Sequence, residues 1–234
     1  MLTVLLALCA GCRTAQVPAS SRAVRADGYS ADEVLAYFGE IAFASEYGGW
    51  RGCLCKWGAP IVYMADGAYT EEDVRLLEEL CGRLNGIPGF PGIRRAEPDE
   101  AGVNFTVSFV DAQTLEDRFG EDARGAFGMS RFYWETDTGV IVRAEAAIRA
   151  DTTPAEAKMS VICEEFLQSL GLAADSYAVP ESVFYEGYST STRPAPIDWA
   201  LLELLYSDAL APGAANEAAM DTARKLLSAG ESQT

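Results

Sequence analysis

The chain has 234 residues, of which 49% are hydrophobic, so it is long and apolar enough to form one domain with a buried core. Its formal net charge is −17 and it contains no histidine. Phosphate backbones are bound by clustered lysines and arginines, so this acidity argues against nucleic acid or an anionic membrane surface as a partner. The lack of imidazole excludes histidine-dependent triads and zinc sites, and no glycine-rich phosphate loop is present, so we expect no cofactor.

The N-terminus has features of a lipoprotein signal. Leu2 to Ala10 is an apolar run too short to span a bilayer, and it leads into Cys9-Ala10-Gly11-Cys12, which resembles a lipobox. We predict a signal peptide over residues 1–12, lipidation at Cys12 and a flexible polar tether over residues 13–28. The alternative is a cleaved signal peptide without a lipid. The prediction implies an extracytoplasmic protein anchored by its lipid to a bacterial cell membrane.

The expected domain begins with a helix. Ser30 and Glu33 have capping-box spacing, and apolar residues at helical spacing carry the helix to about Ala44. A loop rich in glycine, tryptophan and cysteine follows over residues 46–58. A second helix is predicted from Thr70 to Leu84, capped by Thr70 and with an acidic first turn. Short strands are expected on either side of it, over residues 59–64 and near Ile93.

Three further strands are predicted before the next helix. The clearest alternation of apolar and polar residues places one strand at Val103, Phe105, Val107 and Phe109. Residues 130–134 and 140–148 form two more, joined by turn residues 135–139 as a hairpin. Tyr133 and Trp134 on this hairpin either line a groove for an extended ligand or pack within the sheet.

The helix predicted from Thr153 to Leu170 holds the densest group of chemically capable side chains. Thr153, Pro154 and Glu156 have the spacing of a capping box, and Gly171 is the left-handed residue that ends the helix. One broad stripe is apolar and faces a core: Met159, Ile162, Cys163, Phe166, Leu167 and Leu170. The opposite face carries Glu164, Glu165 and Gln168. It is either a solvated helix surface or part of a site.

The stretch from Glu164 to Leu172, with sequence EEFLQSLGL, resembles the zinc-binding helix of the metzincin metallopeptidases, H-E-x-x-H-x-x-G-x-x-H. Glu165 falls on the general-base glutamate and Gly171 on the glycine. The three histidine positions are occupied by Glu164, Gln168 and Ala174. Downstream, residues 180–185 resemble the Met-turn, with phenylalanine in place of methionine, and residues 196–206 resemble the closing helix.

A closer resemblance, over roughly residues 29–206, is to a bacterial lipoprotein family known as domain of unknown function 2927, in which a helix of the form E-E-x-x-Q-x-L-G-L takes the place of the metal helix. That family has no established activity to carry over. Together the resemblances imply an α+β, zincin-like single domain over residues 29–210. We expect a mixed five-stranded sheet with two packed helices, then a C-terminal helical subdomain, with a helical tail over residues 211–234.

Four cysteines follow the signal segment: Cys53, Cys55, Cys81 and Cys163. An extracytoplasmic location would permit disulfides, although the connectivity is not readable from the sequence. Cys53 and Cys55 are too close in sequence for an easy mutual bridge, whereas Cys81 and Cys163 lie on the core faces of two predicted helices. A four-thiolate zinc site would need paired C-x-x-C spacing, which is absent. Buried free thiols or one bridge are therefore expected.

Three functions fit these patterns. The first is a non-catalytic zincin-like module that binds a peptide or cell-wall glycan through a residual cleft. The second is a structural lipoprotein without a ligand. The third is a metal-independent hydrolase in which Glu165 or Glu164 acts as acid or base, with Asp175 or Tyr185 as partner. Because zinc catalysis needs three protein ligands, we expect neither a metal site nor metallopeptidase activity. The candidate ligand-binding residues are Glu164, Glu165, Gln168, Asp175 and Tyr185.

Overall fold

The computed structural model describes residues 24–44, 52–187 and 191–231. The predicted signal peptide and the predicted lipidation site, Cys12, lie outside these ranges. The helices are α1 (Ala31–Phe43), α2 (Glu71–Leu84), α3 (Ala112–Phe119), α4 (Ala155–Gln168), α5 (Pro196–Leu205) and α6 (Asn216–Glu231), with a 3₁₀ turn at Glu121–Ala123. The strands are β1 (Lys56–Trp57), β2 (Ile61–Gly67), β3 (Ile93–Arg95), β4 (Phe105–Val110), β5 (Gly128–Trp134) and β6 (Val140–Arg149). Among the described helices, none is both long and apolar enough to cross a bilayer.

The structure is a mixed α+β domain whose sheet has six strands rather than the expected five. Strands β3, β2, β4 and β6 are parallel neighbours, and β5 pairs antiparallel with β6 at one edge. The additional strand is β1, which pairs with Val140 and Ile141 at the start of β6. The sequence missed it because two residues in a glycine- and cysteine-rich loop show no periodicity.

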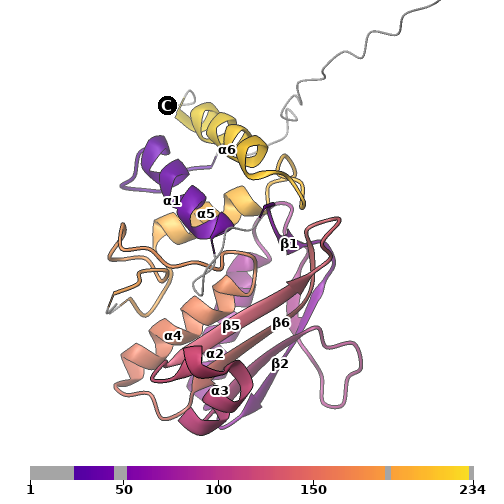
Figure 1. Ribbon diagram of the computed structural model, residues 1–234, viewed down its shortest axis with the longest axis vertical. Helices are drawn as coiled ribbons and strands as arrows, with labels where there is room; N and C mark the ends of the chain where they lie inside the picture. Colours follow the sequence, from indigo (N-terminus) through magenta and orange to yellow (C-terminus); the bar gives the residue numbers. More distant parts are fainter. Residues whose placement is uncertain (1–23, 45–51, 188–190, 232–234) are drawn as a thin grey trace, which may run out of the picture.

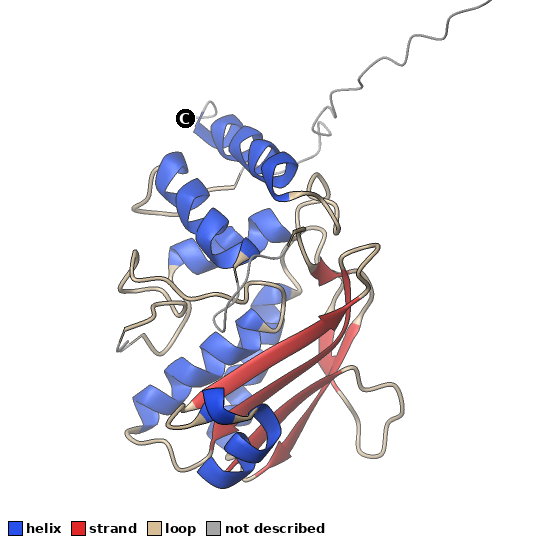
Figure 2. Cartoon of the chain, viewed as in Figure 1, coloured by secondary structure: helices blue, strands red, loops and turns tan. Residues whose placement is uncertain are grey.

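The main core lies between the sheet and helices α2 and α4, which cover one of its faces (Figure 2). The alternation predicted for β4 is confirmed, since Phe105, Val107 and Phe109 are fully buried. The ring of Phe105 lies 5.1 Å from that of Phe166 on α4, centroid to centroid. Burial of such aromatic side chains is the largest apolar contribution a core of this kind receives.

Helix α3 covers the opposite face of the sheet and was not predicted. Its N-cap is Asp111, whose carboxylate accepts a hydrogen bond from the amide of Thr114 at 2.7 Å. Leu115 is its one buried residue. Leu115 forms a small second cluster with Ala123, Met129 and Ala147. A helix of eight residues with one buried side chain gives almost no periodic signal, which explains the omission.

Helix α4 starts and ends differently from the capping pattern expected. It begins at Ala155, and the residue at the N-cap is Pro154, which makes no side-chain cap, so Thr153 and Glu156 do not form a capping box. The hydroxyl upstream that does bond is that of Thr152, which donates to the carbonyl of Arg149 at 2.8 Å. The helix ends at Gln168, two residues before the predicted Leu170, and Gly171 in the turn that follows has the predicted positive φ, +118°.

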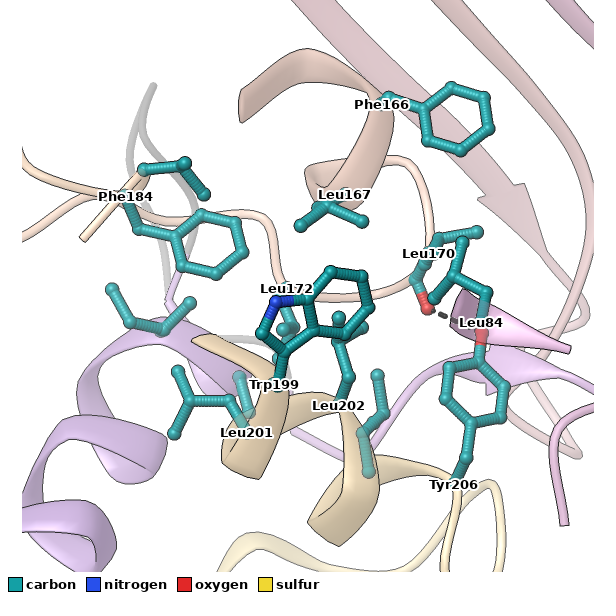
Figure 3. Packing of buried hydrophobic residues seen from close by; sticks show 14 of the residues in the cluster. Leu84, Phe166, Leu167, Leu170, Leu172, Phe184, Trp199, Leu201, Leu202 and Tyr206 are labelled. Atoms are coloured by element: carbon teal, nitrogen blue, oxygen red, sulfur yellow. Dashed lines mark hydrogen bonds between the residues drawn. The ribbon is translucent and has the colours of Figure 1, made fainter. Parts of the chain in front are cut away.

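The residues that follow α4 are bonded to β1 and to the end of α5 by aromatic donors. The indole of Trp57 donates to the carbonyl of Ser169 at 3.0 Å, and the hydroxyl of Tyr206 donates to the carbonyl of Leu170 at 2.8 Å (Figure 3). Gly171 passes so close to Cys55 that a Cβ atom there would lie 2.3 Å from its carbonyl oxygen. The two hydrogen bonds satisfy carbonyls at the end of the helix that lack a partner within it.

Helices α1, α5 and α6 form a helical part beside the sheet and α4 (Figure 1). The capping box predicted for Ser30 and Glu33 is present, and α1 runs to Phe43. Helix α6 packs on α1 and contributes Ala219, Ala223, Leu226 and Leu227 to the main core. Val24 and Ala26, in the segment assigned to a tether, are also buried. The packed chain therefore includes at least part of both segments expected to flank the domain.

Candidate functional site

The polar face of α4 lines a cavity instead of open solvent. The cavity has a volume of about 470 Å³ and lies between α4, the start of β5 and the segment from Asp175 to Gly187. Glu165 and Gln168 are only 5% and 2% exposed. Four of the five predicted ligand-binding residues line this cavity: Glu164, Glu165, Asp175 and Tyr185. The interpretation of this face as a solvated helix surface is therefore wrong for Glu165 and Gln168.

Gly128 on β5 allows the strand to approach α4 beside the cavity. A Cβ atom at this position would lie 2.4 Å from Cγ1 of Val161 and 2.6 Å from Oε1 of Glu165. Distances below 3 Å do not occur for real Cβ atoms, so any side chain here would displace the helix or the carboxylate. The absence of a side chain at Gly128 thus sets how closely Glu165 lies to the edge strand.

Gln168, the fifth predicted residue, lies behind the cavity and holds its neighbours. Its amide nitrogen donates to Oδ1 of Asp175 at 2.7 Å. Its amide oxygen accepts from the hydroxyl of Ser130 on β5 at 2.9 Å. Gln168 therefore connects Ser130 on the edge strand to Asp175 in the opposite wall of the cavity. It acts as a positioning residue.

The wall opposite α4 is formed by two paired stretches of chain. The amide of Ser176 donates to the carbonyl of Phe184 at 2.9 Å, and the amide of Glu186 donates to the carbonyl of Ser176 at 3.2 Å. The hydroxyl of Ser176 donates to Glu40 of α1 at 2.5 Å. Gly187 leaves room for Tyr185, whose ring would lie 2.5 Å from a Cβ atom at that position. The absence of a side chain at Gly187 thus gives the ring of Tyr185 the space in which it lines the cavity.

A buried carboxylate that the sequence did not reveal supports this wall. Asp198 on α5 is fully buried and accepts hydrogen bonds from the hydroxyl of Ser182 at 2.5 Å and from the amides of Val183 and Ala195 at 3.1 and 2.7 Å. Tyr37 of α1 donates to Ser182 at 2.8 Å. Burial raises the pKa of Asp198 to about 6, although its hydrogen bonds act in the opposite direction.

Asp198 fixes the stretch that resembles a Met-turn, residues 180–185, onto the helix that resembles the closing helix. The available signal was an acidic residue in the first turn of a helix that begins with Pro196. Such a residue normally caps the helix at the surface. The burial of Asp198 depends on Ser182 and Tyr37, which are distant in sequence. The local pattern alone therefore does not indicate that Asp198 is buried.

Electrostatically the cavity is acidic. Four carboxylates line it, from Glu164, Glu165, Asp175 and Glu186, and its described lining includes no lysine or arginine. Phe127, Val161, Ala126 and Ala157 supply an apolar part. An arrangement of this kind complements ligands that present a positive charge or hydrogen-bond donors together with an apolar portion.

Other candidate residues lie elsewhere. Tyr133 and Trp134 are 41% and 37% exposed at the far end of β5 and do not line the cavity. Ala174, at the third histidine position of the metzincin pattern, is buried. None of Cys53, Cys55, Cys81 and Cys163 forms a disulfide with another described residue. Cys55, Cys81 and Cys163 are buried, as the first of the two expectations has it, whereas Cys53 is half-buried. Within residues 24–44, 52–187 and 191–231, no group of three or more Cys, Asp or Glu residues is placed to hold a metal ion.

The structure thus defines an α+β domain with an acidic cavity beside the edge strand of its sheet. Residues 31–225 match the sequence profile of a family described as Protein of unknown function (DUF2927). Because the match covers most of the chain, the protein belongs to this family, as its sequence resemblance indicated. No curated protein matches the sequence.

Proposed function

We propose that this protein is a lipid-anchored module of the bacterial cell envelope, with a zincin-like fold that has lost its zinc and binds a peptide or glycan in the residual cleft. The observation that carries the proposal is the cavity of about 470 Å³ that collects Glu164, Glu165, Asp175 and Tyr185. These residues come from the three stretches that resemble the metal helix, the segment after it and the Met-turn. An antiparallel edge strand, β5, borders the same cavity.

The contacts of Gln168 support loss of the metal. In a zinc peptidase this position would present an imidazole nitrogen to the ion, whereas here the amide donates to Asp175 at 2.7 Å and accepts from Ser130 at 2.9 Å. Both ends of the amide are therefore engaged in holding the site together. Ala174 offers only a methyl group, so fewer than the three ligands that catalytic zinc requires are present at the matching positions.

The composition of the cavity favours a ligand with an ammonium or guanidinium group. Four carboxylates line the cavity, and binding a cation there would offset their mutual repulsion. An extended peptide could lie beside β5 and direct one basic side chain between Glu164 and Asp175. An amino group on a cell-wall glycan or its peptide stem presents the same chemistry.

Binding can be tested with two short peptides that differ only in one lysine or glutamate. We expect the lysine peptide to bind and to shift backbone amide resonances of Gly128, Ser160, Glu165 and Tyr185 in NMR spectra, with no shifts from the glutamate peptide. Glu164→Gln should weaken binding at least several-fold, since it removes one charge from the lining.

The matched control is Glu156→Gln, which removes the same charge from an exposed position in the first turn of α4 outside the cavity. Binding of both peptides alike, or equal weakening by both variants, would show only general charge attraction. That outcome would favour a structural lipoprotein without a ligand.

The anchor has a separate test. Cells that express the wild-type chain should incorporate labelled palmitate into it, and Cys12→Ser should abolish the label. Equal labelling of both proteins would contradict the lipid anchor and leave the cleaved signal peptide as the explanation of the N-terminal sequence.

A metal-independent hydrolase is the second candidate, since Glu165, Asp175 and Tyr185 line one cavity. In that case the peptide that binds would be cleaved, and Glu165→Gln would stop cleavage while binding persists.

A further inference from the structure

A second groove lies on the opposite face of the sheet, away from the acidic cavity. It has a volume of about 220 Å³ and lies between α3 and strands β4 and β6. Thr106 and Ser108 of β4, Arg118 and Phe119 of α3, and Arg143 and Glu145 of β6 form most of its lining. Because Ser108 and Ala147 are register partners, α3 lies directly over the junction of the two strands.

The groove concentrates positive charge in a protein whose net charge is −17. Arg118 and Arg143 line it, and Arg131 lies beside it on β5, opposite Glu145 in the sheet register. Glu145 is the only carboxylate in the described lining. Asp66 of β2 is the register partner of Ser108 on the neighbouring strand. The described lining of the groove therefore holds two guanidinium groups and one carboxylate.

Arg131 has a structural role in this group. Its Nε and Nη2 atoms donate to Oε2 of Glu145 at 3.2 and 2.8 Å, and its Nη1 donates to the carbonyl of Arg118 at 3.3 Å. Its guanidinium also lies 4.5 Å from the ring centroid of Phe119. Since its donors are engaged on three sides, Arg131 holds Glu145 and the end of α3 in place.

Arg118 and Arg143 keep most of their donors available. Arg118 donates from Nη1 to the hydroxyl of Ser108 at 2.9 Å, and it forms no ion pair with any residue that the structure describes. Arg143 contacts Glu145 through Nη2, and its guanidinium lies 5.3 Å from the ring centroid of Tyr133. Each guanidinium has five N–H donors, so each could bind an anion without breaking these contacts.

We propose that this groove binds a tetrahedral oxyanion of the phosphate type, between Arg118 on the helix side and Arg143 on the strand side. The guanidinium groups of Arg118 and Arg143 and the hydroxyl of Thr106 line the groove from three elements, α3, β6 and β4. Three donors on separate elements match the several oxygens of a phosphate group better than the two oxygens of a carboxylate. The volume of the groove admits a phosphoryl group either as inorganic phosphate or as the end of a larger molecule. The site is independent of the cavity beside α4.

The test is a titration of inorganic phosphate at constant low ionic strength, followed by NMR resonances of the arginine Nε–H groups. Saturable shifts are expected for Arg118 and Arg143, and a phosphate monoester such as glycerol 3-phosphate should produce the same shifts. Acetate at equal charge should bind at least tenfold more weakly. Arg118→Gln should weaken phosphate binding at least tenfold, and Ser108→Ala should change it less because it preserves the charge.

The matched control is Arg124→Gln, which removes the same charge from the turn after α3, where Arg124 pairs with Glu116 outside the groove. Phosphate binding should be unchanged in this variant. Shifts that do not saturate, equal weakening in the two glutamine variants, or equal affinity for acetate would each overturn the proposal. None of these results bears on lysine-peptide binding at the other face, so the two sites can fail separately.

Discussion

The two faces of the sheet differ in what they bury and in the charge they present. The face toward α4 carries the large core, including Phe105, Phe109 and Phe166, and borders a cavity lined by four carboxylates. The face toward α3 buries only a small cluster around Leu115 and borders a groove with arginines. Stability therefore depends mainly on one face, while an acidic cavity and a groove lined by arginines lie on the two sides of one sheet.

The largest expected effect is on the α4 face. Phe105→Ala should lower the free energy of unfolding by about 3–5 kcal/mol, because the ring is fully buried against Phe166. Leu115→Ala, at the centre of the small cluster on the α3 face, should cost about 2 kcal/mol, at the low end for a buried leucine, because few residues surround it. Denaturant unfolding measures both. A larger loss for Leu115→Ala would reverse the assignment of the main core.

The next effect concerns the support of the cavity wall. The folded state raises the pKa of Asp198 from 3.8 to about 6, so it holds this proton more firmly than the unfolded chain. The associated stability is present below about pH 4 and is lost as the pH rises through about 6. The shift corresponds to about 3 kcal/mol.

Asp198→Asn isolates this contribution from the other carboxylates. The unfolding free energy of the wild type minus that of the variant should fall between about pH 4 and pH 6 and then level off. A difference that does not change with pH would show that the three hydrogen bonds to the carboxylate offset its burial.

The sequence predicts those elements of the two faces whose apolar residues recur with a regular local period. The alternation in β4 and the apolar stripe of α4 identify Phe105 and Phe166 as core residues, and both are fully buried. Helix α3 and strand β1 are too short for such a signal, so neither the sixth strand nor the second covered face was predicted. Local caps were predicted with mixed success, since Ser30 and Thr70 cap their helices whereas Thr153 does not.

The candidate site shows the same limit. A rotation of about 100° per residue is enough to predict that Glu164, Glu165 and Gln168 share one face of the helix. The burial of Glu165 and Gln168 does not follow from it, because their burial depends on Gly128 and Ser130, which lie more than thirty positions earlier in the chain. Asp198 was missed for the same reason. Groups whose roles arise from contacts distant in sequence are not visible in a single sequence.

A smaller effect tests the closeness of β5 to α4. Gly128→Ala should lower stability by about 1–3 kcal/mol, since the new methyl group would overlap Val161 and Glu165. Gly82→Ala on α2 is the matched control. A Cβ atom there meets nothing within 4 Å, and the change should raise stability by about 0.5–1 kcal/mol through helix propensity. Similar effects of the two substitutions would mean that β5 is not held against α4.

The smallest expected effect is that of metal removal. The purified protein should contain well under one equivalent of zinc by elemental analysis, because Gln168 is engaged by Ser130 and Asp175 and Ala174 offers no ligand atom. Treatment with a chelator should leave both the thermal unfolding midpoint and the binding of the lysine peptide unchanged. Without a metal to lower the pKa of a water molecule, Glu165 has no activated nucleophile to deprotonate, so no chelator-sensitive cleavage of a general protein substrate is expected. The opposite result would be one equivalent of tightly bound zinc that is lost together with cleavage activity in Glu165→Gln. That result would identify the cavity beside α4 as the active site of a metallopeptidase.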